Sequence, residues 1–247
     1  MGLGLKNSGL GNGANEVSRS TVRFDPDGTI EVRHCWTEMG QGIHTVARQV
    51  AVEELGVEPD RIKVVVDTTR ELGAGQTTGS RGTVMGAGSV ADACRNAMAG
   101  GCEEGVEYEG VYVVDWTNSI NDGLENPVIH STFGYAAQLV ELDPETGEIA
   151  KVVAAHDVGR AVNPLLCEGQ IEGAVHMGLG YALTEGFPCD EHGKPLNETL
   201  RSLDIIRPKD MPPTEVILVE SPDPNSPYGI KGVGEIGLVP TAGAVAA

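Results

Sequence analysis

Hydrophobic and polar residues alternate in two segments, each folded around a tight turn. Residues 21–24 and 29–33 flank the sequence Asp25-Pro26-Asp27-Gly28, and residues 137–142 and 149–153 flank a second turn at 143–147. Alternation with a period of two is typical of strands, and Pro, Asp and Gly supply turn dihedrals. The pattern predicts two β-hairpins.

Three other segments carry apolar residues at helical spacing, namely residues 43–55, 90–98 and 171–182. Gly56 stands where the first of these helices is expected to end. Residues 61–67 and 215–219 are short and strand-like, and residues 240–247 begin like a helix that is cut before any capping residue. Hairpins with packed amphipathic helices, without a regular βαβ alternation, predict an α+β fold.

Composition narrows the possible partners. The 247 residues include 17 Lys plus Arg and 36 Asp plus Glu, a formal net charge of -19, which disfavours nucleic acid and anionic membrane surfaces. No apolar run could cross a bilayer and the start lacks the pattern of a secretion signal, so we expect a cytoplasmic protein with no membrane role. Five cysteines without Cys-x-x-Cys spacing and six histidines without paired spacing predict neither a disulfide framework nor a metal site made by side chains.

Two glycine-containing loops lead into predicted helices. Gly40-Gln41-Gly42 precedes the helix at 43, and Thr77-Thr78-Gly79-Ser80 precedes the helix that contains residue 90. Backbone N–H groups at a helix start are unpaired, and glycine lets a polar ligand approach them closely. Each loop alone is most simply an ordinary turn, whereas both together favour a binding site for a large polar ligand.

A third loop, Lys231-Gly232-Val233-Gly234-Glu235, places a carboxylate between glycine and the apolar Ile236. A partly desolvated acid of this kind suits a general base, and the simpler alternative is a solvated loop acid without a role. The Gly86-x-Gly88 spacing fails as a dinucleotide fingerprint because no strand leads into it. Neither a Gly-x-Ser-x-Gly elbow nor a Walker loop occurs, which disfavours serine hydrolase and P-loop chemistry.

These loops, with Asp157-Val158-Gly159, Asn163-Pro164 and Gly169-Gln170-Ile171-Glu172-Gly173-Ala174, resemble the xanthine dehydrogenase/aldehyde oxidase family of molybdenum hydroxylases. The loop sequences are most similar to bacterial enzymes of the selenium-dependent xanthine dehydrogenase type. The resemblance implies that residues 1–247 are the second, C-terminal molybdenum-cofactor-binding domain, with halves 1–125 and 126–247. It also implies that an upstream cofactor domain is missing from the chain.

The resemblance implies a role for each loop. Glu235 would be the catalytic base, and the cofactor, molybdopterin or its cytosine dinucleotide, would contact Gly40, Gln41, Gly42, Thr77, Thr78, Gly79, Ser80, Gln170, Gly232 and Gly234. A purine, another N-heterocycle or an aldehyde would be hydroxylated with oxygen from water. Electrons would pass to iron-sulfur and FAD groups in partner subunits of an oligomer.

Two other hypotheses stay open at this point. The chain could be a fragment that acts only as a structural or partner-binding domain without turnover. It could instead be a metal-free isomerase that uses Glu235 as its base, although the sequence offers no electrophile for such an enzyme.

Overall fold

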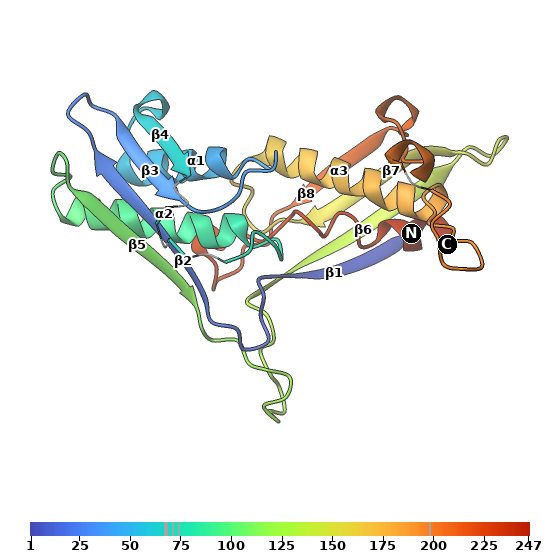
Figure 1. Ribbon diagram of the computed structural model, residues 1–247, viewed down its shortest axis with the longest axis horizontal. Helices are drawn as coiled ribbons and strands as arrows, with labels where there is room; N and C mark the ends of the chain where they lie inside the picture. Colours follow the sequence, from blue (N-terminus) through green and yellow to red (C-terminus); the bar gives the residue numbers. More distant parts are fainter. Residues whose placement is uncertain (67–68, 71, 74, 198) are drawn as a thin grey trace.

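The computed structural model describes residues 1–66, 69–70, 72–73, 75–197 and 199–247, and arranges them in two lobes (Figure 1). The first lobe contains β2 (Glu16–Phe24), β3 (Ile30–His34), α1 (Ile43–Leu55), β4 (Ile62–Val66), α2 (Gly82–Ala99) and β5 (Glu107–Val114). The second contains β1 (Gly2–Ser8), β6 (Thr132–Leu142), β7 (Ile149–Asp157), α3 (Pro164–Leu183), β8 (Thr214–Val219) and α4 (Thr241–Ala246). Short 3-10 turns lie at Pro59–Arg61, Leu200–Leu203, Pro208–Asp210 and Pro227–Gly229.

The two lobes share one topology. Their sheets run in the orders β4-β3-β2-β5 and β8-β7-β6-β1, and in each an antiparallel hairpin is followed by a helix and a parallel strand. The helix in this crossover is α1 in the first lobe and α3 in the second. α2 packs against β2 and β5, and α4 occupies the equivalent position against β6 and β1. The α+β prediction is confirmed.

Both predicted hairpins are confirmed, with Phe24 opposite Ile30 in the first and Val140 opposite Val152 in the second. α1 ends at Gly56, as predicted, because Gly56 adopts the left-handed conformation that closes a helix. α3, however, begins at Pro164 rather than near residue 171. The side chain of Asn163 accepts a hydrogen bond from the N–H of Leu166, and proline is well tolerated in a first turn.

β1 is a strand that the sequence pattern did not predict. It pairs with β6, so the first residues of the chain belong to the lobe otherwise built from residues after 131. Its glycines face α4, where a Cβ on Gly2 would lie 2.3 Å from the carbonyl oxygen of Pro240. Glycines lie on the inner face of β1 and leucines on its outer face, which reverses the usual pattern of large apolar side chains facing inward. Dividing the chain at residue 125, as expected from the sequence, therefore separates the strands of the two sheets with one exception. β1 precedes residue 125 but belongs to the second sheet.

Each lobe has its own apolar core. Trp36 is fully buried in the first, where its indole N–H donates to the hydroxyl of Ser18 at 3.0 Å. The second core is smaller and centres on Ile171, Val175 and Leu179 of α3 packed over β7. Within the described residues, no helix is long and apolar enough to span a membrane.

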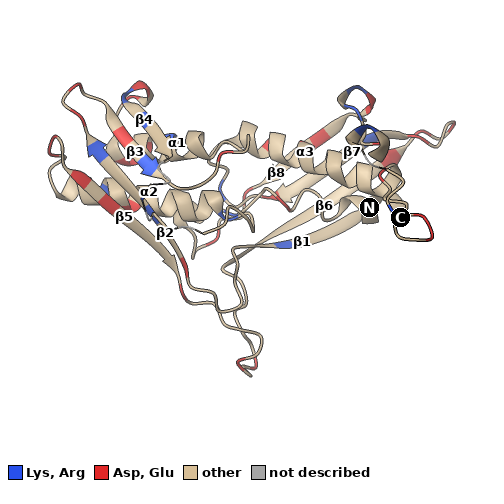
Figure 2. Cartoon of the chain, in the orientation of Figure 1, with Lys and Arg blue, Asp and Glu red and all other residues tan. Residues whose placement is uncertain are grey.

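The face of the second sheet that points away from α3 and α4 is largely apolar, and no element of the described residues covers it. β1 and β6 carry few charged residues (Figure 2). The large apolar side chains exposed on this outward face are Leu3, Leu5, Tyr135, Leu139, Ile217 and Val219. Side chains on one face of a strand recur every second residue, and the strand register brings these together. We call this surface the outer sheet face.

Candidate functional site

A cavity of about 330 Å³ lies where the loops that precede α1, α2, α3 and α4 meet. Met39 and Gln41 come from the loop before α1, and residues 77–81 from the loop before α2. Residues between 158 and 163 precede α3, and residues between 230 and 235 precede α4. The shared topology of the lobes therefore explains the site, because equivalent loops from both lobes converge on one point.

Most of the residues predicted for the site line this cavity: Gln41, Thr77, Thr78, Gly79, Ser80, Gln170, Gly234 and Glu235. Gly40, Gly42 and Gly232 are not among its lining residues. A Cβ on Gly232 would lie 2.1 Å from the carbonyl oxygen of Ser80, and one on Gly42 would lie 2.5 Å from Cδ1 of Leu166. These two glycines allow neighbouring segments to approach closely around the cavity.

The N-terminus of α1 is already occupied by a side chain. The Glu38 carboxylate accepts hydrogen bonds from the backbone N–H groups of Gly40 and Gly42 at 2.9 Å and of His44 at 3.2 Å. Burial opposes ionisation of Glu38, but these donors hold the pKa of its carboxyl below the ordinary value. The N–H groups of Gly40 and Gly42, expected to face a ligand, are therefore used by Glu38.

Gln41 is likewise engaged within its own loop. Its amide nitrogen donates to the carbonyl of Thr37 and its amide oxygen accepts from the N–H of Met39, both at 2.6 Å. The side chain lines the cavity with both of its polar ends paired. To contact a ligand, Gln41 would have to rotate out of these hydrogen bonds or accept a second hydrogen bond at its amide oxygen.

The start of α2 differs, because its N-cap residue, Arg81, makes no capping hydrogen bond with its side chain and its first residues, Gly82 and Thr83, line the cavity. The preceding Gly79 and Ser80 both adopt left-handed backbone conformations, with φ of 66° and 51°. The loop is held in place by a hydrogen bond from the N–H of Gly9 to the carbonyl of Gly79 at 2.9 Å. Of the two glycine-containing loops predicted to bind a polar ligand, this is the one that leads into a helix start open to the cavity.

A buried ion pair fixes the same loop from behind. The Arg81 guanidinium donates to the Glu16 carboxylate at 2.8 Å and to the carbonyl of Gln76 at 2.6 Å, and both charged side chains are almost fully buried. The other oxygen of Glu16 accepts from the N–H groups of Leu10 and Gly11, so the segment after β1 is tied to the α2 loop. Arg81 was not predicted, since only the tertiary structure pairs it with Glu16.

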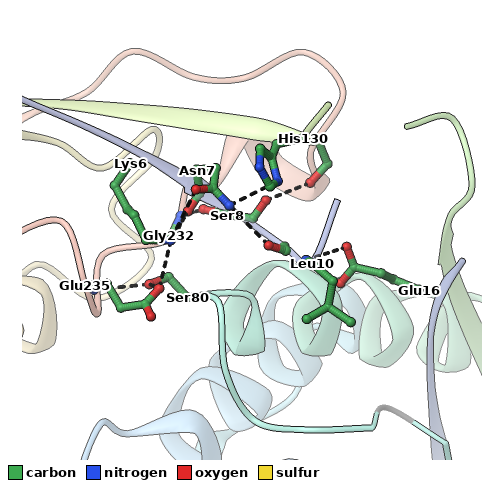
Figure 3. Close-up of polar contacts among 11 residues, drawn as sticks. Lys6, Asn7, Ser8, Leu10, Glu16, Ser80, His130, Gly232 and Glu235 are labelled. Atoms are coloured by element: carbon green, nitrogen blue, oxygen red, sulfur yellow. Dashed lines mark hydrogen bonds and ion pairs between the residues drawn. The ribbon is translucent and has the colours of Figure 1, made fainter. Parts of the chain in front are cut away.

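Glu235 lies at the rim of the cavity, beside Ser80 and Lys6 (Figure 3). Its Oε2 atom accepts from the Ser80 hydroxyl at 2.8 Å and lies 3.0 Å from the Lys6 ammonium nitrogen. The Ser80 hydroxyl also accepts from the backbone N–H of Glu235 at 3.1 Å. The Glu235 side chain is 47% exposed, so about half of it is shielded from solvent within this chain. The apolar residue that follows, Ile236, points into the protein and is fully buried.

Three further residues missed by the sequence patterns, Lys231, Asp157 and Ser8, hold the Glu235 loop. Lys231 forms a buried ion pair of 2.6 Å with Asp157 at the end of β7. The N–H of Gly232 donates to the hydroxyl of Ser8, at the end of β1, at 2.8 Å. Lys231 and Asp157 each stand inside a segment singled out from sequence, but nothing local to either segment indicates their pairing.

The cavity wall suits a polar organic group rather than a bare metal ion. Its polar lining includes the amides of Gln41 and Gln170 and the hydroxyls of Thr77 and Thr78, beside apolar Ile43, Val46 and Leu166. Among the described residues, no three His, Cys, Asp or Glu side chains cluster as a metal site requires. Amides, hydroxyls and an open helix start fit a pterin that carries its own metal and a phosphate.

Comparison with known proteins identifies the family. The molybdopterin cofactor-binding domain model matches residues 1–104 and 97–212. The nicotine 6-hydroxylase large subunit of Paenarthrobacter nicotinovorans is 30% identical over 94% of this chain and 34% of its own length. A probable xanthine dehydrogenase subunit of Bacillus subtilis is 28% identical over 95% of this chain and 36% of its own length.

The fold agrees with these sequence matches. The aldehyde oxidoreductase structure from Desulfovibrio gigas superimposes with a TM-score of 0.82 at 25% identity, over 98% of this chain and 29% of that one. The chain thus spans about a third of the length of these relatives. With the family model covering most of its residues, this chain belongs to the molybdopterin cofactor-binding domains of the xanthine dehydrogenase/aldehyde oxidase family.

Proposed function

We propose that this chain forms one wall of the molybdenum-cofactor site of a hydroxylase, with Glu235 as the base. The substrate class is a purine, another N-heterocycle or an aldehyde, and the oxygen added comes from water. The observation that carries the proposal is the convergence of the four helix-leading loops on a cavity with Glu235 held at its rim. Relatives named as nicotine, xanthine and aldehyde oxidoreductases support the substrate class.

In this proposal the residues of the chain bind the cofactor and orient the reacting groups. The start of α2, with Thr77, Thr78, Gly79 and Ser80 before it, offers backbone N–H groups and threonine hydroxyls to the polar edge of the cofactor. Gln170 of α3 contacts it from the second lobe. When bound, molybdopterin, as such or as its cytosine dinucleotide, supplies the redox centre that takes electrons from the substrate. Glu235 takes up the proton released during hydroxylation.

We also propose that the outer sheet face is covered by the other molybdenum-cofactor domain of the complete subunit. The face is apolar, with Leu3 73% and Tyr135 61% exposed, and large exposed apolar patches mark interaction sites. The relatives are about three times as long as this chain, so a domain of sufficient size exists in them to cover it. Iron-sulfur and FAD subunits complete the proposed electron path. A second copy is disfavoured, since each chain carries a formal charge of -19.

The uncovered face also favours the second candidate, a structural domain without turnover. One experiment separates the two. The protein is purified from its native host with its partners, and molybdenum per chain and the oxidation of purines, N-heterocycles and aldehydes are measured. The hydroxylase proposal predicts near-stoichiometric molybdenum and a roughly 10²–10⁴-fold loss of turnover in Glu235→Gln with molybdenum retained. If the complex contains no molybdenum although other molybdenum enzymes of the same cells contain theirs, the hydroxylase proposal fails and the structural role is supported.

A further inference from the structure

Lys6 and Ser80 both contact the same oxygen atom of Glu235 (Figure 3). Oε2 receives the Ser80 hydroxyl and the Lys6 ammonium at 2.8 and 3.0 Å. Among the described residues, the contacts of the Glu235 carboxylate are these two, and neither involves Oε1. The carboxylate is therefore held from one side, with one oxygen paired and the other open.

The elements behind these two side chains are fixed. Lys6 lies on β1 opposite Gly134 of β6, and its ammonium also donates to the backbone carbonyl of Asn7 at 2.8 Å. The Asn7 amide nitrogen in turn lies 3.0 Å from Nδ1 of His130, and this contact holds the end of β1 against the segment that precedes β6. Ser80 is set by its left-handed backbone and by the reciprocal bond with the N–H of Glu235. Both donors are thus positioned independently of the Glu235 carboxylate.

We infer that Lys6 and Ser80 are positioning residues that hold Glu235 with Oε1 as the proton-accepting oxygen. The inference rests on the proposed function of Glu235 as the base. An ion pair with Lys6 24% and Glu235 47% exposed adds little to folding stability, because solvent screens it. Its main effect is on geometry. Fixing a reacting group in one orientation can change rates strongly without changing substrate binding.

The first test is kinetic and uses the cofactor-loaded protein purified with its native partners. Lys6→Met is expected to lower kcat by about 10–100-fold with little change in KM, because a positioning residue acts on the transition state. Lys6→Arg is expected to recover most of this loss, since its guanidinium also donates to a carboxylate. Ser80→Ala should lower kcat in the same direction. Lys209→Met, which removes an exposed ion pair with Asp210 on the turn Pro208–Asp210, is the matched control and should leave kcat unchanged.

The second test combines variants. In the Glu235→Gln background, Lys6→Met is expected to cause no further loss, because residues that act through one group are not additive. An equal loss in both backgrounds would show that Lys6 acts elsewhere and would overturn the inference. Normal kcat in Lys6→Met together with a large loss in Glu235→Gln would also overturn it while leaving the proposed function intact. Normal turnover in Glu235→Gln would instead overturn the base assignment.

A third test does not depend on turnover. A zero-length carbodiimide reagent joins an amine and a carboxylate that are in direct contact, and is expected to link Lys6 to Glu235 in a peptide identified by mass spectrometry. Lys6→Arg and Glu235→Gln should each abolish the link, and Lys209→Met should keep it. Molybdenum content is measured in every variant, so that loss of cofactor is not mistaken for loss of positioning. Absence of the link in the unmodified protein would contradict the geometry.

Discussion

Among single residues, two buried ion pairs matter most to the site, because each fixes one of its loops. Arg81 and Glu16 hold the loop before α2, and Lys231 and Asp157 hold the loop before α4. Both pairs have additional hydrogen bonds, such as that from the N–H of Gly159 to Asp157 at 3.0 Å. Buried charges of this kind contribute mainly by fixing a geometry, because desolvation offsets much of their attraction.

Lys231→Met is expected to lower the free energy of unfolding by about 3–5 kcal/mol, since it leaves the Asp157 carboxylate buried without its partner. Urea denaturation measures the change. The double variant Lys231→Met/Asp157→Asn should recover part of the loss, because it removes the unpaired charge. Lys151→Met, which breaks an exposed pair, should stay within about 1 kcal/mol of the unmodified protein. Equal losses in the two lysine variants would contradict the role of burial.

Buried histidines predict how stability depends on pH. His34 is 1% exposed, and its pKa is lowered from 6.5 to about 4, first by burial and then by the neighbouring His44, while Glu38 opposes the shift. Because the folded pKa is below the unfolded one, this stabilisation is present above pH 6.5 and is lost as the pH falls toward 4. The loss from His34 amounts to about 3 kcal/mol.

His34→Asn tests this expectation. Asparagine keeps an acceptor for the N–H of Trp36, which donates to Nδ1 of His34 at 3.1 Å, but does not titrate. The free energy of unfolding should therefore fall less steeply between pH 6.5 and 4 than in the unmodified protein. His192→Asn, at an exposed position, should leave the slope as it is. An unchanged slope in His34→Asn would rule out His34 as the cause.

Between elements, the packing of α3 gives its glycines two different roles. Gly178 is buried against α4, where a Cβ would lie 2.4 Å from Cβ of Thr241. Thr241 is itself fixed, since its hydroxyl donates to the amide oxygen of the buried Gln138 at 2.8 Å. Gly173, on the same helix, is exposed and has open space around it. The close approach of α3 and α4 therefore requires glycine only at the first position.

The pair Gly178→Ala and Gly173→Ala should consequently shift stability in opposite directions. Gly178→Ala is expected to lower the free energy of unfolding by about 1–3 kcal/mol because the added methyl overpacks the helix interface. Gly173→Ala should raise it by about 0.4–1 kcal/mol, since alanine reduces the entropy of the unfolded chain and favours the helix. Thermal and urea unfolding of both variants measure the changes. Destabilisation by Gly173→Ala would contradict the open space around this position.

Across the whole molecule, the shared topology of the lobes creates the site and leaves one sheet face uncovered. Equivalent loops meet between the lobes, so the cavity needs both of them. Helices cover the inner face of each sheet, but within the described residues the outer sheet face has no covering element. The site and the proposed partner surface are therefore on different sides of the second sheet.

Leu3→Glu and Leu139→Glu are expected to weaken the association with the rest of the proposed molybdenum hydroxylase, because each places a charge in the proposed apolar contact. Both residues are exposed in this chain, so its own unfolding should change little. Co-purification from the native host and molybdenum per chain measure the effect. Leu200→Glu, at a position as exposed as Leu3 but on the turn at Leu200–Leu203, should retain both. Full assembly of the two sheet variants would contradict the proposed contact.

The local elements and the family could be predicted from the amino-acid sequence. Alternation around 25–28 and 143–147 encodes the two hairpins, and helical spacing with Gly56 encodes α1 and its end, because these signals depend only on neighbouring residues. The sequence also indicated the loops from which most of the cavity lining comes. β1 escaped prediction, since its inner face is glycine rather than an apolar side chain.

The meeting of distant groups, in contrast, became visible only in three dimensions. Lys6 reaches Glu235 because β1 pairs with β6, and Arg81 reaches Glu16 because the α2 loop lies against the segment after β1. Glu38 occupies the N–H groups of Gly40 and Gly42, although its neighbours in sequence would equally allow it to point to solvent. Local patterns record which face of an element is buried, whereas long-range contacts follow from how the buried faces pack together.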